Sequence, residues 1–318
     1  MGLLVNGEWV DDSHDTSSQD GKFVRPETQF RNWITKDGSS GFPPEHGRYH
    51  LYVSLACPWA HRTLIMRTLK GLQNSISVSI VDHFMNDADG WKFSENPGST
   101  LDTVNGCKYM YEIYQKSNPE MTGWVTVPVL WDKVTNKIVN NESPEIILML
   151  NNSYDGPDFY PEELREKIEE VNVWIYDKIN NGVYKSGFAT TQAAYEEAVT
   201  ELFEALDRVE GILDKNRYLV GNRFTTADIR LFTCLVRFDS VYVGHFKCNL
   251  RRLVDYPNIW NYVKEIYQME GIAETVNMDH IKKHYYISHN WINPNGIVPK
   301  GPIIDFNEPH DRALKFPN

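Results

Sequence analysis

The chain has 318 residues, 41% of them hydrophobic and 24% charged, which is enough for about two globular domains. Its formal net charge of −11 disfavours nucleic acid as a partner, because phosphates are repelled by an acidic protein. No apolar run is long enough to span a bilayer, and the first residues lack the pattern of a signal peptide. We therefore expect a cytoplasmic protein without a membrane partner.

Residues 1–47 are rich in Asp, Ser, Gly and Pro, yet they contain four well-separated aromatic residues. Disordered tails are usually poor in aromatics. We therefore expect an extended arm that packs its aromatic side chains onto the rest of the protein. These side chains are Trp9, Phe23, Phe30 and Trp33.

A strand–helix–strand unit follows the arm. Residues 48–55 and 76–81 alternate and are rich in strand formers, whereas 58–70 have apolar residues at helical spacing. The connection between the two strands is long enough for them to be parallel. A short helix is expected near 108–116.

Two further strands are predicted at 125–131 and 137–140, the first interrupted by Pro128. A helix then begins with Ser143 and Pro144, residue types that are favoured at the N-cap and at the first helical position. Residues 48–155 therefore predict one α/β domain.

The remaining chain has a helical pattern, which predicts an all-α domain at 156–288 and a non-helical, proline-rich tail at 289–318. Residues 225–228, with the sequence Thr-Thr-Ala-Asp, resemble a capping box at the start of one helix. The clearest helical segments are 161–181, 192–215, 225–243 and 257–269.

The cysteines and histidines do not have the spacing of a metal site. The four cysteines, at positions 57, 107, 234 and 248, include no C-x-x-C pair, so neither a zinc ribbon nor a dithiol redox pair is indicated. His280 and His284 lack the Glu of a metalloprotease motif, and we interpret this pair as helix surface. We expect no metal.

Cys57 differs from the other cysteines because it lies between a predicted strand and a helix that begins with Pro58. It is expected at the N-cap or beside it, where unpaired amide groups and the helix dipole favour a thiolate. Thiols at such positions have pKa values of about 3.5–7.5 instead of about 8.5. His61 and Arg62 can add positive charge. Although most cysteines are structural, this placement indicates a nucleophile.

Several segments resemble the glutathionyl-hydroquinone reductases, which are the Xi-class glutathione transferases. They are residues 52–62, 180–185, 236–239, 242–248 and 292–296. The resemblance implies a thioredoxin-like N-terminal domain followed by the all-helical C-terminal domain of a glutathione transferase. It also implies an oxidoreductase that acts on a sulfur group, with glutathione as co-substrate, glutathionylated quinols as substrates and a homodimer as the assembly.

The same resemblance assigns roles to individual residues. Cys57 would be the nucleophile, Tyr184 the proton donor to the departing aromatic ring, and Tyr242 and Tyr285 would stabilise the thiolate. All three tyrosines are expected in the helical domain. Pro128 would be a cis-proline. The glutathione-binding set would be Trp91, Trp124, Val125, Thr126, Val127, Glu142 and Ser143. Trp124 replaces an arginine that many relatives have, so it brings no charge to the site.

Two other functions remain open. An Omega-like thiol transferase or dehydroascorbate reductase would use Cys57 but would not need Tyr184. A non-catalytic binding protein on a transferase-like fold would have an unreactive Cys57. Conjugation of glutathione to electrophiles is disfavoured, because a thiolate at this position captures glutathione as a disulfide.

Overall fold

A computed structural model describes residues 2–10, 20–25, 27–86 and 88–317. The chain forms two compact units, and each is discontinuous in sequence. Unit 1 contains the described residues of 1–14, 26–158 and 275–297, and unit 2 contains those of 15–25, 159–274 and 298–318. None of the described helices is both long and apolar enough to cross a lipid bilayer.

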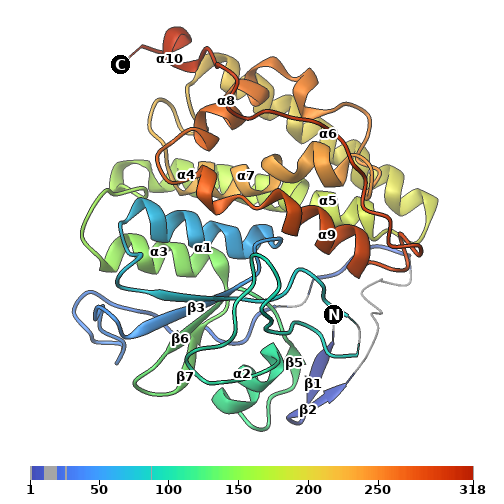
Figure 1. The fold of residues 1–318 in the computed structure, drawn as a ribbon. Coiled ribbons are helices and arrows are strands. Elements are labelled where there is room, and N and C mark those ends of the chain that lie inside the picture. Colours follow the sequence, from blue (N-terminus) through green and yellow to red (C-terminus); the bar gives the residue numbers. More distant parts are fainter. Residues whose placement is uncertain (1, 11–19, 26, 87, 318) are drawn as a thin grey trace. The chain divides into compact units, whose positions relative to one another are not determined.

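Unit 1 is built on a four-stranded mixed sheet with the order β4-β3-β6-β7. Strands β3 and β4 are parallel, whereas β6 is antiparallel to both β3 and β7. Helices α1 and α3 cover one face of the sheet, and α2 lies on the other side (Figure 1). This arrangement confirms the expected α/β domain. The elements are β3 Tyr49–Val53, α1 Pro58–Leu69, β4 Ser77–Ile80, α2 Met110–Ser117, β6 Val129–Asp132, β7 Lys137–Asn140 and α3 Ser143–Ser153.

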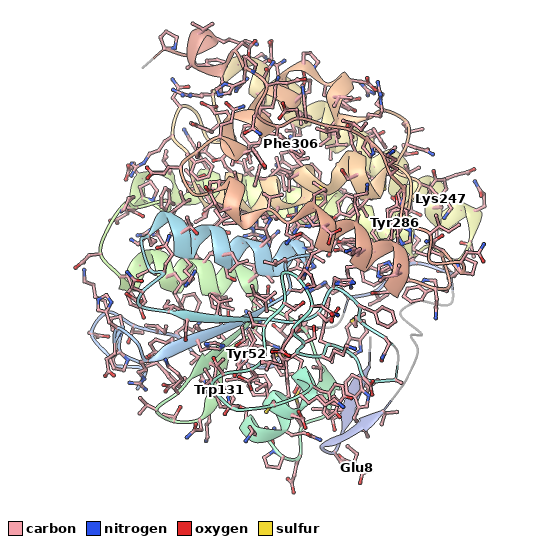
Figure 2. The ribbon with its side chains drawn as sticks, viewed as in Figure 1. Glu8, Tyr52, Trp131, Lys247, Tyr286 and Phe306 are labelled. Carbon is pink, nitrogen blue, oxygen red and sulfur yellow. The ribbon has the colours of Figure 1, made fainter. Side chains whose placement is uncertain are left out.

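The central strand β3 is buried along its whole length. Tyr52 on β3 and Trp131 on β6 lie in the interior (Figure 2). The Tyr52 hydroxyl donates a hydrogen bond to Asp102 at 3.0 Å and accepts one from Asn105 at 2.9 Å. Burial lowers the pKa of His50 to about 4, so this ring is neutral in the core. The rigid strand fixes the start of the segment that leads to Cys57.

The strand expected at 125–131 begins only at Val129, because the residues before it turn through Pro128. The preceding strand β5, Gly123–Trp124, belongs to a second sheet with the order β2-β1-β5. Strands β1, Leu3–Val5, and β2, Glu8–Val10, form a hairpin that the sequence analysis did not predict.

Three of the four aromatic residues of the expected arm pack against other parts of the chain, as predicted. Trp9 stacks on Tyr111 with ring centroids 4.8 Å apart, and Phe30 makes an edge contact with Tyr114 at 5.6 Å. Phe23 makes an edge contact with Phe188 at 5.4 Å within unit 2. Residues 1, 11–19 and 26 of the arm lie outside the described residues.

Helix α3 begins one residue earlier than its sequence signals suggest. Its N-cap is Glu142, and Ser143 is its first helical residue. The assignment of Ser143 as the N-cap is therefore wrong, and its hydroxyl takes another role, described below.

Unit 2 is helical, as expected. Two π-helical turns, η2 and η3, interrupt it, and α10 lies in the tail, so the expectation of a wholly non-helical tail is wrong. The elements after α3 are η1 Glu162–Leu164, α4 Arg165–Ile175, η2 Tyr176–Asn180, α5 Gly182–Gly187, α6 Gln192–Lys215, α7 Thr226–Arg237, η3 Phe238–Tyr242, η4 Leu253–Asp255, α8 Pro257–Tyr267, η5 Ala273–Thr275, α9 Met278–Ser288 (a helix of unit 1) and α10 Arg312–Lys315.

The predicted capping box at the start of α7 is confirmed. The carboxylate of Asp228 is fully buried and accepts hydrogen bonds from the Thr225 amide at 2.8 Å and hydroxyl at 3.1 Å. It also accepts hydrogen bonds from the Leu219 amide at 3.0 Å and the Tyr262 hydroxyl at 2.9 Å. One side chain thus joins α7, α8 and the loop before α7.

Replacing Asp228 with Ala leaves these four donors without their acceptor in the core. We expect Asp228→Ala to lower the free energy of unfolding by about 2–4 kcal/mol, measured by urea titration. The matched control is Asp279→Ala, which removes an exposed first-turn carboxylate on α9 paired with Lys283. It should cost less than about 0.5 kcal/mol. Equal effects of the two substitutions would contradict this account of the capping box.

Candidate active site

Cys57 is the N-cap of α1, with φ −74° and ψ 121°, and Pro58 follows it as the first helical residue. The first turn of α1 contains no acidic residue. The amide groups at the helix start therefore act on the sulfur without a competing negative charge on that turn. Cys57 is half-buried, whereas Cys107, Cys234 and Cys248 are buried. The expectation that Cys57 caps the helix is confirmed.

The Cys57 sulfur lies 3.6 Å from the carbonyl oxygen of Val127, to which the thiol can donate a hydrogen bond. The next peptide bond, Val127–Pro128, is cis, which is the isomer that the resemblance implied. The carbonyl contact favours the neutral thiol, but a thiol is a weak donor. The helix N-terminus favours the thiolate, as it does for other thiols placed there.

The start of α3 lies next to α1 through a buried contact between side chains. Arg62 on α1 is 1% exposed, and its Nη1 donates to the Ser143 hydroxyl at 3.3 Å. Its guanidinium also lies over the Trp59 ring, 4.5 Å from the centroid. Arg62 therefore brings a positive charge to the start of α3, where the helix dipole also favours an anion.

Glu142 is held beside this helix start by two hydrogen bonds. Its amide donates to the Asn140 side chain at 2.7 Å, and its carboxylate accepts from the Thr28 hydroxyl at 3.0 Å. The side chain is half-buried and makes no capping bond to its own helix. A carboxylate and a helix start, where the helix dipole favours an anion, thus lie next to each other.

The segment before Pro128 is fixed by Tyr114 of α2. The Tyr114 hydroxyl donates to the Thr126 carbonyl at 2.9 Å and accepts from the Thr126 amide at 3.3 Å. The Asn141 side chain donates to the same hydroxyl at 3.1 Å. Val125 and Val127 on either side are buried. The loop before Pro128, which contacts Cys57 through Val127, is therefore held in place by Tyr114 of α2.

Trp91 and Trp124 lie on two separate segments of unit 1. Trp91 is buried and stacks on His284 of α9, with ring centroids 4.8 Å apart and an interplanar angle of 24°. Trp124 is half-buried at the end of β5, opposite Leu3 of β1. Neither the stack of Trp91 on His284 nor the pairing of Trp124 with Leu3 has a signal in the local sequence.

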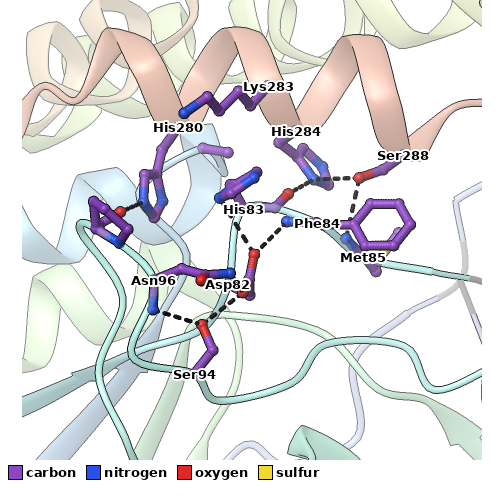
Figure 3. Close-up of polar contacts among 12 residues, drawn as sticks. Asp82, His83, Phe84, Met85, Ser94, Asn96, His280, Lys283, His284 and Ser288 are labelled. Atoms are coloured by element: carbon purple, nitrogen blue, oxygen red, sulfur yellow. Dashed lines mark hydrogen bonds and ion pairs between the residues drawn. The ribbon is translucent and has the colours of Figure 1, made fainter. Parts of the chain in front are cut away.

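The loop after β4 is bound to α9 by the histidines shown in Figure 3. His284 donates from Nδ1 to the His83 carbonyl at 3.0 Å, and His280 donates from Nε2 to the Pro97 carbonyl at 2.7 Å. The Ser288 hydroxyl accepts from the Met85 amide at 3.1 Å. His280 and His284 are buried, so their interpretation as helix surface is wrong. The sequence feature that could have indicated their burial is the helical spacing that they share with Ile281, Tyr285 and Ser288, which form one buried stripe on α9.

The base of this loop is organised by the carboxylate of Asp82. It accepts from the Phe84 amide at 2.9 Å, the Ser94 hydroxyl at 2.6 Å and the Asn96 side chain at 2.7 Å (Figure 3). Burial raises the pKa of Asp82, but these hydrogen bonds outweigh burial and the pKa is lowered overall. Burial lowers the pKa of the adjacent His83, whose Nδ1 is 3.2 Å from Asp82 but is not aligned for a hydrogen bond.

The three tyrosines singled out from the sequence lie in different places. Tyr285 is buried on α9 of unit 1, between the rings of His284 and His289. Tyr184 on α5 and Tyr242 at the end of η3 are neighbours in unit 2, with ring centroids 6.2 Å apart. Tyr184 thus does not share a unit with Tyr285, although all three were expected in one domain.

Tyr184 is the half-buried member of an aromatic cluster, whereas Tyr242 is fully buried. Phe188, Phe246 and the arm residue Phe23 surround the Tyr184 ring at centroid distances of 5.7, 5.4 and 6.4 Å. The π-helical turn η2 ends four residues before Tyr184, and η3 contains Tyr242. Such turns occur frequently at functional sites. The cluster offers an apolar, aromatic surface beside the half-buried Tyr184 ring.

The structure therefore groups most of the candidate residues. In unit 1, Cys57 contacts Val127, Ser143 contacts the helix of Cys57 through Arg62, and Trp91 contacts the helix of Tyr285. In unit 2, Tyr184 and Tyr242 are together. Within the part of the chain that the structure describes, no three His, Cys, Asp or Glu side chains form a group that could hold a metal ion.

The chain combines a thiol at a helix N-terminus, a neighbouring cis-proline loop, a mixed sheet and a helical unit. These features together define a protein of the glutathione transferase type. Comparisons with known families agree. The family model for the glutathione S-transferase N-terminal domain matches residues 56–153, and that for the C-terminal domain matches residues 192–265.

The chain is 55% identical to glutathionyl-hydroquinone reductase YqjG of Escherichia coli, with 99% of this chain and 100% of that protein covered. It is 52% identical to glutathionyl-hydroquinone reductase PcpF of Sphingobium chlorophenolicum, with 95% and 96% covered. The glutathione-bound structure of YqjG matches with a TM-score of 0.91 over 99% of this chain and 100% of that chain, at 52% identity. The Xi-class transferase of Natrialba magadii matches with a TM-score of 0.92 over 99% and 97%, at 49% identity.

The chain belongs to the glutathione S-transferase family, within the group of glutathionyl-hydroquinone reductases and Xi-class transferases. The expected fold of a thioredoxin-like domain and a helical transferase domain is confirmed.

The geometry predicts which thiol reacts first. Burial, followed by the negative charges of Asp102 and Glu112, raises the pKa of Cys107 to about 12, and burial also raises that of Cys248. At about pH 6, iodoacetamide should therefore modify Cys57 alone, since a thiolate is the reactive form. Peptide mapping by mass spectrometry checks this. The control variant Cys57→Ser should remain unmodified, and modification spread over the buried thiols would contradict the prediction.

Proposed function

We propose that this chain catalyses the glutathione-dependent reduction of glutathionyl-hydroquinones to hydroquinones, with release of glutathione disulfide. The observation that carries the proposal is the half-buried Cys57 at the start of α1, 3.6 Å from the Val127 carbonyl. Two relatives that are more than half identical over nearly the whole chain carry the name of this activity, which supports it.

Glutathione binds in unit 1 as an extended peptide. Its cysteinyl backbone pairs with that of Val127, since a backbone segment beside a cis-proline and outside the sheet ladder suits strand-like pairing. Its γ-glutamyl carboxylate rests on the start of α3 at Ser143, supported by the positive charge of Arg62. Its ammonium group is received by Glu142. Trp91 and Trp124 contact the peptide, and Val125 and Thr126 shape the loop.

The first half-reaction forms a mixed disulfide. The Cys57 thiolate attacks the glutathione sulfur of the substrate, so a sulfur–sulfur bond forms and the sulfur–carbon bond to the aromatic ring breaks. The electron pair of the broken bond stays on the ring carbon, which takes a proton from the Tyr184 hydroxyl. The hydroquinone leaves, and the Tyr184 phenolate regains its proton from solvent. Tyr242 and Tyr285 stabilise the Cys57 thiolate by hydrogen bonding.

The second half-reaction regenerates the enzyme. Position 60 is alanine, so Cys57 has no C-x-x-C partner to resolve its disulfide. A second glutathione thiolate attacks the glutathionyl sulfur, glutathione disulfide leaves, and the Cys57 thiolate returns. The cycle uses two electrons from glutathione and needs no metal. We further propose that the enzyme works as a homodimer in the cytoplasm.

The role of Tyr184 separates this function from that of an Omega-like thiol transferase. We expect Tyr184→Phe to lower kcat on a glutathionyl-hydroquinone by about a hundredfold, because the ring carbon loses its proton donor. Exchange with a small non-aromatic glutathione disulfide should change less than about threefold, because a sulfur leaving group needs no such donor. Steady-state kinetics on both substrates measures the difference.

Cys57→Ser is the companion variant and should abolish both reactions. Equal effects of Tyr184→Phe on the two substrates would contradict its role as the proton donor. An active Cys57→Ser enzyme would contradict the whole mechanism.

A further inference from the structure

The N-terminal hairpin has a tight turn that its sequence specifies. Asn6 and Gly7 join β1 to β2, and both have left-handed backbones, with φ of 49° and 79°. Two such residues form the type I′ turn that suits the twist of a two-residue hairpin. A Cβ at Gly7 would lie 1.7 Å from the Pro119 carbonyl oxygen, so glycine is required where the hairpin meets the loop after α2.

One strand of the hairpin holds the segment that carries Trp124. Strand β1 pairs antiparallel with β5, with Leu3 opposite Trp124 and Leu4 opposite Gly123. Additional bonds continue the pairing: the Gly7 amide donates to the Met121 carbonyl at 2.8 Å. Without the hairpin, the two-residue strand β5 would have no partner in its sheet, whose order is β2-β1-β5.

The other strand holds the loop that carries Trp91. On β2, the Trp9 indole donates from Nε1 to the Ala88 carbonyl at 2.6 Å, and its ring stacks on Tyr111. The same ring covers Gly90, where an added Cβ would lie 2.7 Å from it. Gly90 immediately precedes Trp91, so Trp9 fixes the backbone that positions the Trp91 ring.

We infer that the hairpin Leu3–Val10 positions glutathione, by fixing the two segments that carry Trp91 and Trp124. Trp9 is a positioning residue in this arrangement, since it holds one segment directly and β1 of the same hairpin holds the other. The inference rests on the proposed function, in which both tryptophans contact glutathione. An arm that only covers α2 would influence stability without influencing glutathione affinity.

The test uses the full-length protein and compares Trp9→Ala with Trp9→Phe. Trp9→Ala removes the indole bond, the stack on Tyr111 and the cover over Gly90. We expect the KM for glutathione to rise about fivefold to tenfold and kcat to change less than about twofold, because the reacting groups remain in place. Phe keeps an aromatic ring that can stack on Tyr111, so Trp9→Phe should keep the KM within about twofold of the natural protein.

Glu8→Ala is the matched control, because Glu8 lies on the same strand with an exposed side chain (Figure 2). It should leave the KM for glutathione unchanged. Trp9→Leu keeps apolar volume in the hairpin without the stack or the indole bond. It should raise the KM for glutathione as Trp9→Ala does, and it replaces Trp9→Ala in the test if the alanine variant folds poorly. An unchanged KM in a folded Trp9→Ala or Trp9→Leu protein would overturn the inference.

Trp91→Ala distinguishes a failure of this inference from a failure of the proposed glutathione site. If Trp91→Ala raises the KM for glutathione and the Trp9 variants do not, the hairpin has no positioning role although the site is correct. If Trp91→Ala and Trp124→Ala both leave the KM unchanged, the proposed tryptophan contacts themselves are wrong, and the inference is lost with them.

Discussion

The position of Cys57 at the N-cap of α1 is the constraint on which the proposed chemistry depends. A nucleophilic thiol must be an anion near neutral pH, and it must be reachable by a substrate sulfur. The helix start supplies the first condition through its amide groups, and no acidic residue in that turn opposes them. Partial burial supplies the second condition for this cysteine, whereas the other three cysteines are buried.

The surroundings of Cys57 are made rigid by buried polar side chains that join segments far apart in sequence. Tyr114 holds the loop before Pro128, Arg62 joins α1 to the start of α3, and Asp82 organises the loop after β4. Tyr114 and Asp82 each have several defined hydrogen-bond partners, and such networks favour a single arrangement. A catalytic site gains from this rigidity, because its reacting groups are already aligned before the substrate binds.

The sequence predicted those features of the fold that depend on local patterns. The helix predicted at 192–215 and the strand predicted at 137–140 have the observed bounds of α6 and β7. The strand–Cys-Pro–helix pattern correctly placed Cys57 at a helix start. Local patterns failed at the start of α3, where two neighbouring residues could each be the N-cap. Ser143 is of a type favoured at that position, yet Glu142 is the N-cap and Ser143 is the first helical residue.

Other features could not be predicted because they depend on contacts across the chain. His280 and His284 have a spacing that fits either a surface or a buried stripe, and only the packing of α9 against the loop after β4 decides between them. The link between Arg62 and Ser143 joins residues 81 positions apart. The hairpin at Asn6-Gly7 is different, because this dipeptide is a local turn signal and the expectation of an extended arm did not take it into account.

A single-turnover experiment tests the central claim most directly. The protein is mixed with an equal amount of a glutathionyl-hydroquinone in the absence of free glutathione, and both the released hydroquinone and the intact protein mass are measured. The account predicts one hydroquinone released per chain and one glutathionyl group added, mapped to Cys57. Release of hydroquinone without an adduct on Cys57, or no release until free glutathione is added, would contradict it.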